Sequence, residues 1–217
     1  HHPSRWESKA MLEACRYPLV KLKDLVCERN EMLIPARNLA GSIIRYTGLA
    51  HIESETGVAV QSPTPADSLK SGVRRYEPGD ILFAKMRPNL RKVALASFEE
   101  GGYASPECAV LTVRQMKGNP IVDPLLLSVL LRTDFVFGQI LHHVAGIGRP
   151  RIGTKELREV LVPLPPLDVQ ARMRAEFLKG QNSAAEKQRE SEELLRQATA
   201  VVQDSVRALV SGFTGVH

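Results

Sequence analysis

Cationic side chains gather in one short segment of the chain, residues 79–96, which reads GDILFAKMRPNLRKVALA. Four cations fall within eight positions there, and no Asp or Glu occurs from residue 81 to residue 98. Ammonium and guanidinium groups at this density raise the local electrostatic potential and attract anions. The segment therefore predicts a surface for an anionic ligand. Its cations are Lys85, Arg87, Arg91 and Lys92.

A second window without acids covers residues 135–155 and contains the glycine-rich stretch GIGRPRIG. Two windows of one charge sign favour a basic face, and such a face is typical of proteins that bind nucleic acids. The alternative is that the cations are spread around a solvated surface. The bases of this second window are His142, His143, Arg149, Arg151 and Lys155.

No arrangement of residues indicates catalysis. In GIGRPRIG, Arg151 stands where the third glycine of a dinucleotide fingerprint belongs. A P-loop and the Asp/Asn-Pro-Pro-Tyr/Phe tetrapeptide of amino-methyltransferases are both missing from the sequence. His51 and Glu53 share a strand face, but an isolated pair of this kind is more often structural. We therefore expect no catalytic residue and no cofactor.

The three cysteines, Cys15, Cys27 and Cys108, lack metal-ligand spacing, which predicts reduced thiols, a cytoplasmic protein and no metal site. The longest strongly apolar run, PLLLSVLL, is far shorter than the ~20 residues that a membrane span needs. The net charge is +5, and residues 168–217 hold seven acids and seven bases, so residues 1–167 carry the whole excess.

The elements that must position the cations alternate along residues 1–167. Apolar alternation and turn residues predict an α+β fold with mostly antiparallel strands. Asp123 and Asp134 are candidate caps of two helices, and a short helix is expected from Thr154. Residues 61–72 contain two prolines and are expected to form a polar loop. The strand-like segments are 17–26, 42–53, 80–86, 91–98, 106–114 and 160–165.

From Asp168 onward one helical pattern runs nearly to the end of the sequence. Its seam repeats at alternating steps of four and three from Met173 to Ser205, which is heptad spacing, and it is apolar at both ends but polar in the middle. A helix of this kind needs a partner to bury the stripe. The alternative is a helix folded back on its own domain. The predicted partner-binding residues are Leu194, Leu195, Ala198, Val202 and Leu209.

Several segments, taken in their order, resemble the specificity subunits of Type I restriction–modification systems. They cover most of residues 17–173, and GDILFAKMRPNL and PLPPLDVQARM are the most diagnostic. The others are YTGLAHIESETG, ASPECAVLTVR and GRPRIGTKELREVLV.

The resemblance implies a noncatalytic, cytoplasmic DNA-binding subunit with a target-recognition domain at residues 1–167. A helix at 168–217 would then serve as spacer, dimerisation and methyltransferase-docking region. Family members usually carry two recognition domains and two helices packed as an antiparallel coiled coil, whereas this chain has one of each. The implied partners are double-stranded DNA, DNA methyltransferase subunits, a second copy of the chain and, in some assemblies, a restriction subunit.

Several alternatives stay open. The chain could be a half-subunit that dimerises or a fragment of a longer polypeptide, although SVRALVSGFTGVH resembles a family helix end. It could also be the target-recognition fragment of a fused methyltransferase. Outside the family, the alternatives are a cryptic nuclease and a coiled-coil adaptor whose basic face binds an acidic protein.

With DNA as the ligand, Lys85 and Arg87 are expected on the outer face of a strand while Leu82, Ala84 and Met86 pack inward. The amides at Thr154 would favour a phosphate. The competing interpretation is that Arg87 or Arg151 pairs internally with Asp80 or Glu107. The predicted DNA-binding residues are Lys85, Arg87, Asn89, Arg91, Lys92, Arg149, Arg151 and Lys155.

Overall fold

The computed structural model describes residues 3–141, 143–144 and 150–211, and their side chains at 8–141, 143–144 and 150–203. The chain forms two compact units, His1–Ala171 and Arg172–His217. The predicted α+β class, with mostly antiparallel strands and a long C-terminal helix, is confirmed.

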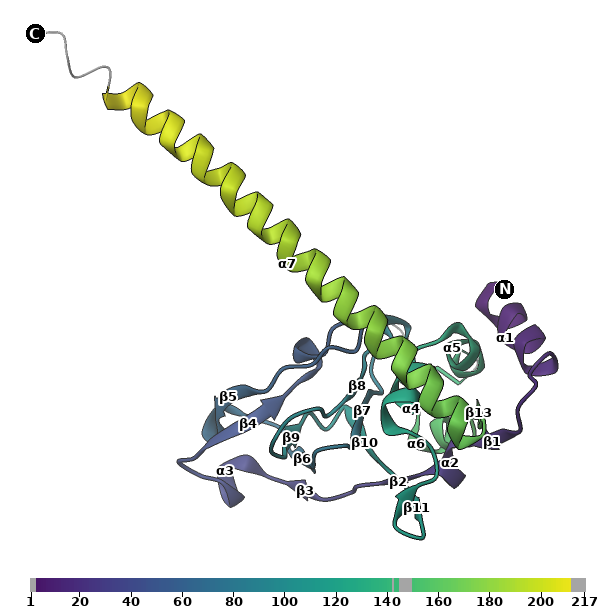
Figure 1. The fold of residues 1–217 in the computed structure, drawn as a ribbon. Coiled ribbons are helices and arrows are strands. Elements are labelled where there is room, and N and C mark those ends of the chain that lie inside the picture. The colour runs from purple at the N-terminus through teal and green to yellow at the C-terminus, as the bar shows by residue number, and fades with distance from the viewer. Residues whose placement is uncertain (1–2, 142, 145–149, 212–217) are drawn as a thin grey trace, which may run out of the picture. The chain divides into compact units, whose positions relative to one another are not determined.

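A four-stranded antiparallel sheet lies at the centre of the first unit (Figure 1). Its two middle strands consist almost entirely of buried apolar residues, as expected for strands covered on both faces. Three of its strands fall inside segments that the sequence predicted as strands. In spatial order the strands are β2 (Val26–Glu28), β10 (Cys108–Val113), β7 (Ile81–Ala84) and β8 (Val93–Leu95).

A five-stranded sheet forms the second layer. All of its pairs are antiparallel except β4 with β9. The segment 61–72 was expected to be a loop, and this was wrong, because Ser62–Pro65 pairs with β4 as an edge strand. Pro63 and Pro65 are tolerated there because the outer side of an edge strand needs no donors. The order is β3 (Met32–Leu33), β6 (Val73–Tyr76), β9 (Gly102–Ala104), β4 (Ile43–Thr47) and β5 (Ser62–Pro65).

Short helices and two small strand pairs complete the first unit. Asp123 caps α4 as predicted, accepting a hydrogen bond from the Leu126 amide. The other expected cap, Asp134, was wrong, because Thr133 occupies the N-cap position of α5, whereas α6 begins at Thr154 as expected. The helices are α1 (Pro3–Glu13), α2 (Leu22–Leu25), α3 (Pro35–Asn38), η1 (Leu49–His51), η2 (Ala66–Ser68), η3 (Pro88–Leu90), α4 (Pro124–Leu130), α5 (Asp134–Ile140) and α6 (Thr154–Arg158). The strand pairs are β1 (Leu19–Lys21) with β13 (Leu161–Pro163), and β11 (Gln115–Met116) with β12 (Asn119–Pro120).

The core has two parts, one on each face of the central sheet. Ile81 and Phe83 of β7 point into the larger cluster, which α4, α5 and α6 complete with residues such as Leu127 and Leu157. Leu82 lies in the smaller cluster, which includes Tyr76 from the five-stranded sheet. Because alternate residues of β7 enter opposite clusters, no face of this strand is open to solvent. Each such fully buried side chain stabilises the fold by ~1.5–3 kcal/mol.

This packing corrects the expected geometry of the cationic strand. Strand β7 ends at Ala84, so Lys85 and Arg87 do not alternate along an exposed strand face. Arg87 instead adopts a left-handed conformation, with φ 51° and ψ 57°. Met86 is half-buried and pairs across the chain with Arg151.

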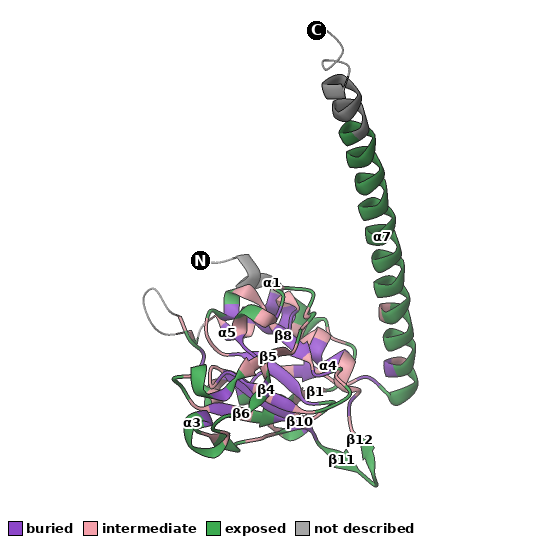
Figure 2. Cartoon of the chain, turned by 90° about the vertical axis from the view of Figure 1, so that its left-hand side faces the viewer, coloured by how far each residue is buried: buried purple, intermediate pink, exposed green. Residues whose placement is uncertain are grey.

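The second unit belongs to one continuous helix, α7, which runs from Leu167 to Ser211. It starts one residue before the predicted start at Asp168, which therefore lies in its first turn. Almost all of its described residues beyond Ala171 are exposed, and the cartoon in Figure 2 colours this part of the helix green. In the part of the chain that the structure describes, no helix is both long and apolar enough to cross a membrane.

Candidate functional site

The two basic segments, far apart in the sequence, meet in space. Met86 and Arg151 form an antiparallel bridge. On one side of it the Arg87 amide donates to the Pro150 carbonyl at 2.7 Å, and on the other the Ile152 amide donates to the Lys85 carbonyl at 3.1 Å. Residues 85–87 and 150–152 are therefore joined through their backbones.

A tight turn projects from this junction. It consists of η3, Pro88–Leu90, flanked by Arg87 and Arg91, which both have positive φ (51° and 49°). A left-handed conformation costs a residue other than glycine about 1–2 kcal/mol. Pro88 is buried and holds the turn on the core, whereas Asn89 is exposed. Strain of this kind gathers at functional sites, where the surrounding structure enforces it.

The two arginines of the turn have opposite surroundings. The Arg91 guanidinium forms an ion pair with Asp134 and lies 4.8 Å from the centre of the Phe137 ring. The side chains of Arg87 and Asn89 are exposed, and neither has a polar partner among the described residues. Arg91 therefore fixes the turn to α5, and Arg87 and Asn89 are available to a ligand.

The remaining predicted cations also divide into tied and available groups. The Lys92 ammonium donates to the Leu49 carbonyl at 2.8 Å, so it serves the fold. Arg151 forms a 2.6 Å ion pair with Glu107, which is one of the internal pairings considered from the sequence, but its side chain is 53% exposed. An exposed pair of this kind contributes about 0–1 kcal/mol and can be exchanged for a ligand. Lys155 is exposed on α6, and Arg149 lies outside the described residues.

Lys85 is half-buried at the end of β7. Burial lowers the pKa of its ammonium, and the neighbouring Arg74 guanidinium lowers it further. Arg74 is itself engaged, at 3.4 Å from the Glu28 carboxylate and 3.2 Å from the Asn30 side-chain oxygen. Behind Lys85, burial raises the pKa of the Cys108 thiol to about 12, so Cys108 is neutral.

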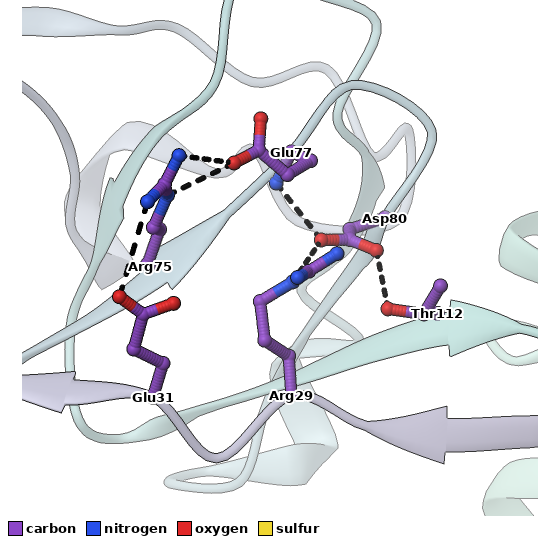
Figure 3. Close-up of polar contacts among 6 residues, drawn as sticks. All are labelled: Arg29, Glu31, Arg75, Glu77, Asp80 and Thr112. Atoms are coloured by element: carbon purple, nitrogen blue, oxygen red, sulfur yellow. Dashed lines mark hydrogen bonds and ion pairs between the residues drawn. The ribbon is translucent and has the colours of Figure 1, made fainter.

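Other cations of the domain are held in an internal network (Figure 3). Asp80 is 2% exposed and accepts three hydrogen bonds, from Arg29 Nε at 2.9 Å, the Glu77 amide at 2.8 Å and Thr112 Oγ1 at 2.6 Å. The bond to Asp80 raises the pKa of Arg29. Asp80 therefore pairs with Arg29 and not with Arg87 or Arg151, so this network serves the fold.

Residues that could perform chemistry have structural partners. His51 Nδ1 accepts a hydrogen bond from the Gly48 amide at 3.1 Å, and Glu53 accepts one from Thr56 at 2.6 Å. Within the described ranges, no group of three or more His, Cys, Asp or Glu side chains could hold a metal ion. Sequence reasoning missed Arg74, because nothing in its local sequence indicates that the fold brings β6 of one sheet near the end of β7 of the other, where Lys85 lies.

The predicted partner-binding residues of α7 lie along its exposed length. Leu194 is 60% exposed, Leu195 69% and Val202 62%, and Ala198 is also exposed. The side chain of Leu209 lies outside the described residues. The helix therefore carries an apolar stripe that is exposed to solvent within its own unit.

Comparison with known proteins finds related systems both by sequence and by fold. No family model matches the chain. The specificity subunit of the Type I restriction enzyme EcoDI from Escherichia coli is 31% identical over 121 residues, which are 55% of this chain and 25% of that protein.

Two solved structures have a similar fold. One comes from a structural study of complex assembly and conformational transition of the type I R-M system. It has a TM-score of 0.66 and 23% identity over 89% of this chain. The other is the HsdS subunit of Thermoanaerobacter tengcongensis, with a TM-score of 0.65 and 23% identity over 89% of this chain. The chain spans 49% and 47% of these two proteins. The resemblance that the sequence motifs indicated is confirmed.

Proposed function

We propose, on the premise that the chain is related to the specificity subunits of Type I restriction–modification systems, that its first unit binds double-stranded DNA in a sequence-specific manner. The bound chain directs a partner DNA methyltransferase, and in some assemblies a restriction subunit, to the target. The chain itself supplies recognition and no catalytic group.

The observation that carries this proposal is the backbone junction between residues 85–87 and 150–152. It brings two acid-free windows of the sequence to one place, where their cations act together on the phosphates of a duplex. Each phosphate that they neutralise releases counterions, which makes this kind of binding dependent on salt.

The surroundings of each residue suggest its role in the proposed site. Arg87 and Asn89 are exposed on a rigid turn, which suits reading of base edges, because Arg pairs with guanine and Asn with adenine through two hydrogen bonds. Arg151 and Lys155 suit contacts with phosphates, which set the register of the protein on DNA. Arg91 and Lys92 are left out of the proposed contact set, because the fold already holds their charges.

The helix α7 is proposed to pair with the same helix of a second copy in an antiparallel coiled coil. Its exposed apolar stripe supports this pairing, because burial of such a stripe drives helix association. With 45 residues the helix is about 65 Å long. That length is close to two turns of duplex, so the dimer would read a bipartite, symmetric target.

A salt titration with a pool of random-sequence duplexes tests the DNA-binding proposal. We expect the wild-type chain to bind at low salt, and log Kd to rise linearly with log salt. The double variant Arg87→Ala/Lys155→Ala removes two available cations and should weaken binding at low salt at least tenfold. Fluorescence anisotropy of labelled duplex gives both quantities.

The matched control is Arg37→Ala/Lys70→Ala, which removes one Arg and one Lys at exposed positions outside the basic segments. It should bind within about twofold of the wild type. Equal, negligible binding of the wild-type chain at low and high salt would end the proposal, and equal losses in both double variants would show that net charge alone is responsible.

A further inference from the structure

The ammonium of Lys85 lies among charged groups that are already paired with one another. The ionisable groups that act on it are Arg74, Glu28, Glu107 and Cys108, and the thiol is neutral. Glu28 is paired with Arg74, and Glu107 with Arg151. Each of the two carboxylates therefore already has an arginine partner, whereas the ammonium of Lys85 has no hydrogen-bond or ion-pair partner in the described part of the chain.

The backbone around Lys85 is fixed on both sides. Its amide donates to the Glu107 carbonyl at 2.9 Å, and its carbonyl accepts from the Ile152 amide at 3.1 Å. Strand β7, which precedes it, is held between two neighbours in the central sheet. The main chain that carries the ammonium is therefore held in place, so less conformational entropy is lost when a ligand binds.

Arg74 carries a buried donor that lacks a partner in the described part of the chain. Its Nε atom is buried and has no hydrogen-bond partner among the described residues, although another nitrogen of the same guanidinium contacts Glu28 and Asn30. A buried donor without a partner costs about 1–3 kcal/mol. The Arg74 guanidinium thus retains a donor that the described residues do not use.

We propose that Lys85, supported by Arg74, is the binding position, or seat, of one phosphate group. An oxyanion supplies negative charge and acceptor oxygens to an ammonium that has no partner among the described residues and is partly removed from water, where charge-assisted hydrogen bonds are strong. Lys85 is half-buried, whereas Arg87 and Asn89 lie exposed on the neighbouring turn. A half-buried cation suits the outer backbone of a duplex better than the base edges within its grooves.

The source of the phosphate is the DNA backbone, and this part of the inference rests on the proposed function. It assigns Lys85 to affinity and register, and leaves sequence preference to the exposed turn. Inorganic phosphate has the same chemistry, so the experiment has one arm for each source.

The test compares the wild type with Lys85→Met, which keeps an unbranched side chain, shorter by one atom, and removes the charge. In the duplex arm the slope of log Kobs against log salt should be smaller in magnitude by about 0.9, the value for one phosphate. Between 50 and 200 mM salt the wild-type affinity should then fall about 3.5-fold more than that of the variant. The sequences selected from the random duplex pool should stay the same.

In the small-anion arm, inorganic phosphate should raise the thermal midpoint of the wild type more than chloride at equal ionic strength, and Lys85→Met should abolish this difference. Lys70→Met makes the same change at an exposed lysine and should retain the phosphate effect. Because Lys85 is unpaired, we expect Lys85→Met to fold with an unchanged or higher midpoint.

Several results would overturn the inference. An unchanged slope with an unchanged phosphate effect shows that Lys85 is not a phosphate seat, and an altered base preference makes it a base-reading residue. If the wild type fails to bind any duplex but retains a Lys85-dependent phosphate effect, the proposed function fails while the seat stands, with a small anion as its ligand.

Discussion

At the scale of single residues, the turn at Pro88 shows that residue type does not determine role. Arg87 and Arg91 flank the same short helix and share a left-handed backbone conformation. One is exposed, and the other is held by Asp134 and the Phe137 ring. A cation on a predicted basic surface can therefore either bind a ligand or attach that surface to the core. The residues that surround the cation decide which of these two roles it has.

A pair of glycine substitutions separates these roles. In Arg87→Gly the strained backbone is relieved, because glycine adopts positive φ readily, so the thermal midpoint should be equal or higher while DNA affinity falls. In Arg91→Gly the same relief is outweighed by the loss of the Asp134 ion pair and the Phe137 contact, and stability should fall by about 1–2 kcal/mol. Thermal unfolding and duplex titration of both variants measure this, and a matching loss of stability in the two would refute the distinction.

At the scale of elements, ion pairs connect segments that are distant in the sequence. Glu159 follows α6 and contacts Lys21 and Lys23, at the junction of β1 and α2, with both N–O distances 2.7 Å. Hydrogen bonds from the two lysines lower the pKa of Glu159 to about 2. The bond to Glu159 also raises the pKa of Lys21. These pairs fasten α6, which carries Lys155, to the first strand.

The pH dependence of this contact follows from the direction of the shift. Because the folded-state pKa of Glu159 is about 2 and its ordinary value is 4.5, the stabilisation is complete above pH 4.5 and is lost as the pH falls towards 2. The midpoint difference between wild type and Glu159→Gln should therefore be small and constant near neutrality and shrink below pH 4.5. The group is exposed, so the effect should also weaken with salt.

Thermal unfolding across the acid range measures this effect. Glu13→Gln serves as a control, because Glu13 is exposed and its contact with Lys9 is a 3.9 Å pair within one helix. A Glu159→Gln difference that grows on acidification would contradict the assignment.

At the scale of the whole molecule, the helix α7 carries apolar side chains that no described residue of its own unit covers. Its 45 residues exceed the usual length of a globular helix, and apolar side chains such as Leu194 and Leu195 remain exposed. An isolated stripe of this kind is stabilised when a second helix covers it. The proposed dimer follows from this surface, whereas the proposed DNA contact belongs to the first unit.

The double variant Leu194→Asp/Leu195→Asp tests the pairing. Charged groups on the stripe would be desolvated in a coiled coil, so the variant should be monomeric at concentrations at which the wild type is a dimer. Gln203→Asp adds a charge on the opposite side of the helix and should leave the mass unchanged. Multi-angle light scattering measures the masses, and a wild-type mass for the double variant would exclude pairing through this stripe.

The sequence by itself determined the elements whose signals are local. Apolar runs bounded by turn residues predicted β7, β8 and β10, Asp123 predicted the start of α4, and an uninterrupted helical pattern predicted α7. The cationic composition of the two segments is likewise plain from the order of the residues. These features depend on residues that are neighbours in the chain, so short-range sterics and periodicity are enough to show them.

The tertiary structure alone decided which distant residues meet. It placed Pro63 and Pro65 on an edge strand, joined Met86 to Arg151, and brought Arg74 beside Lys85. Strand pairing and core packing fix these neighbours, and both depend on the register of segments that lie tens of residues apart. A ligand encounters only those charges that are not already paired within the protein. Which charges are paired depends on contacts that only the folded chain makes.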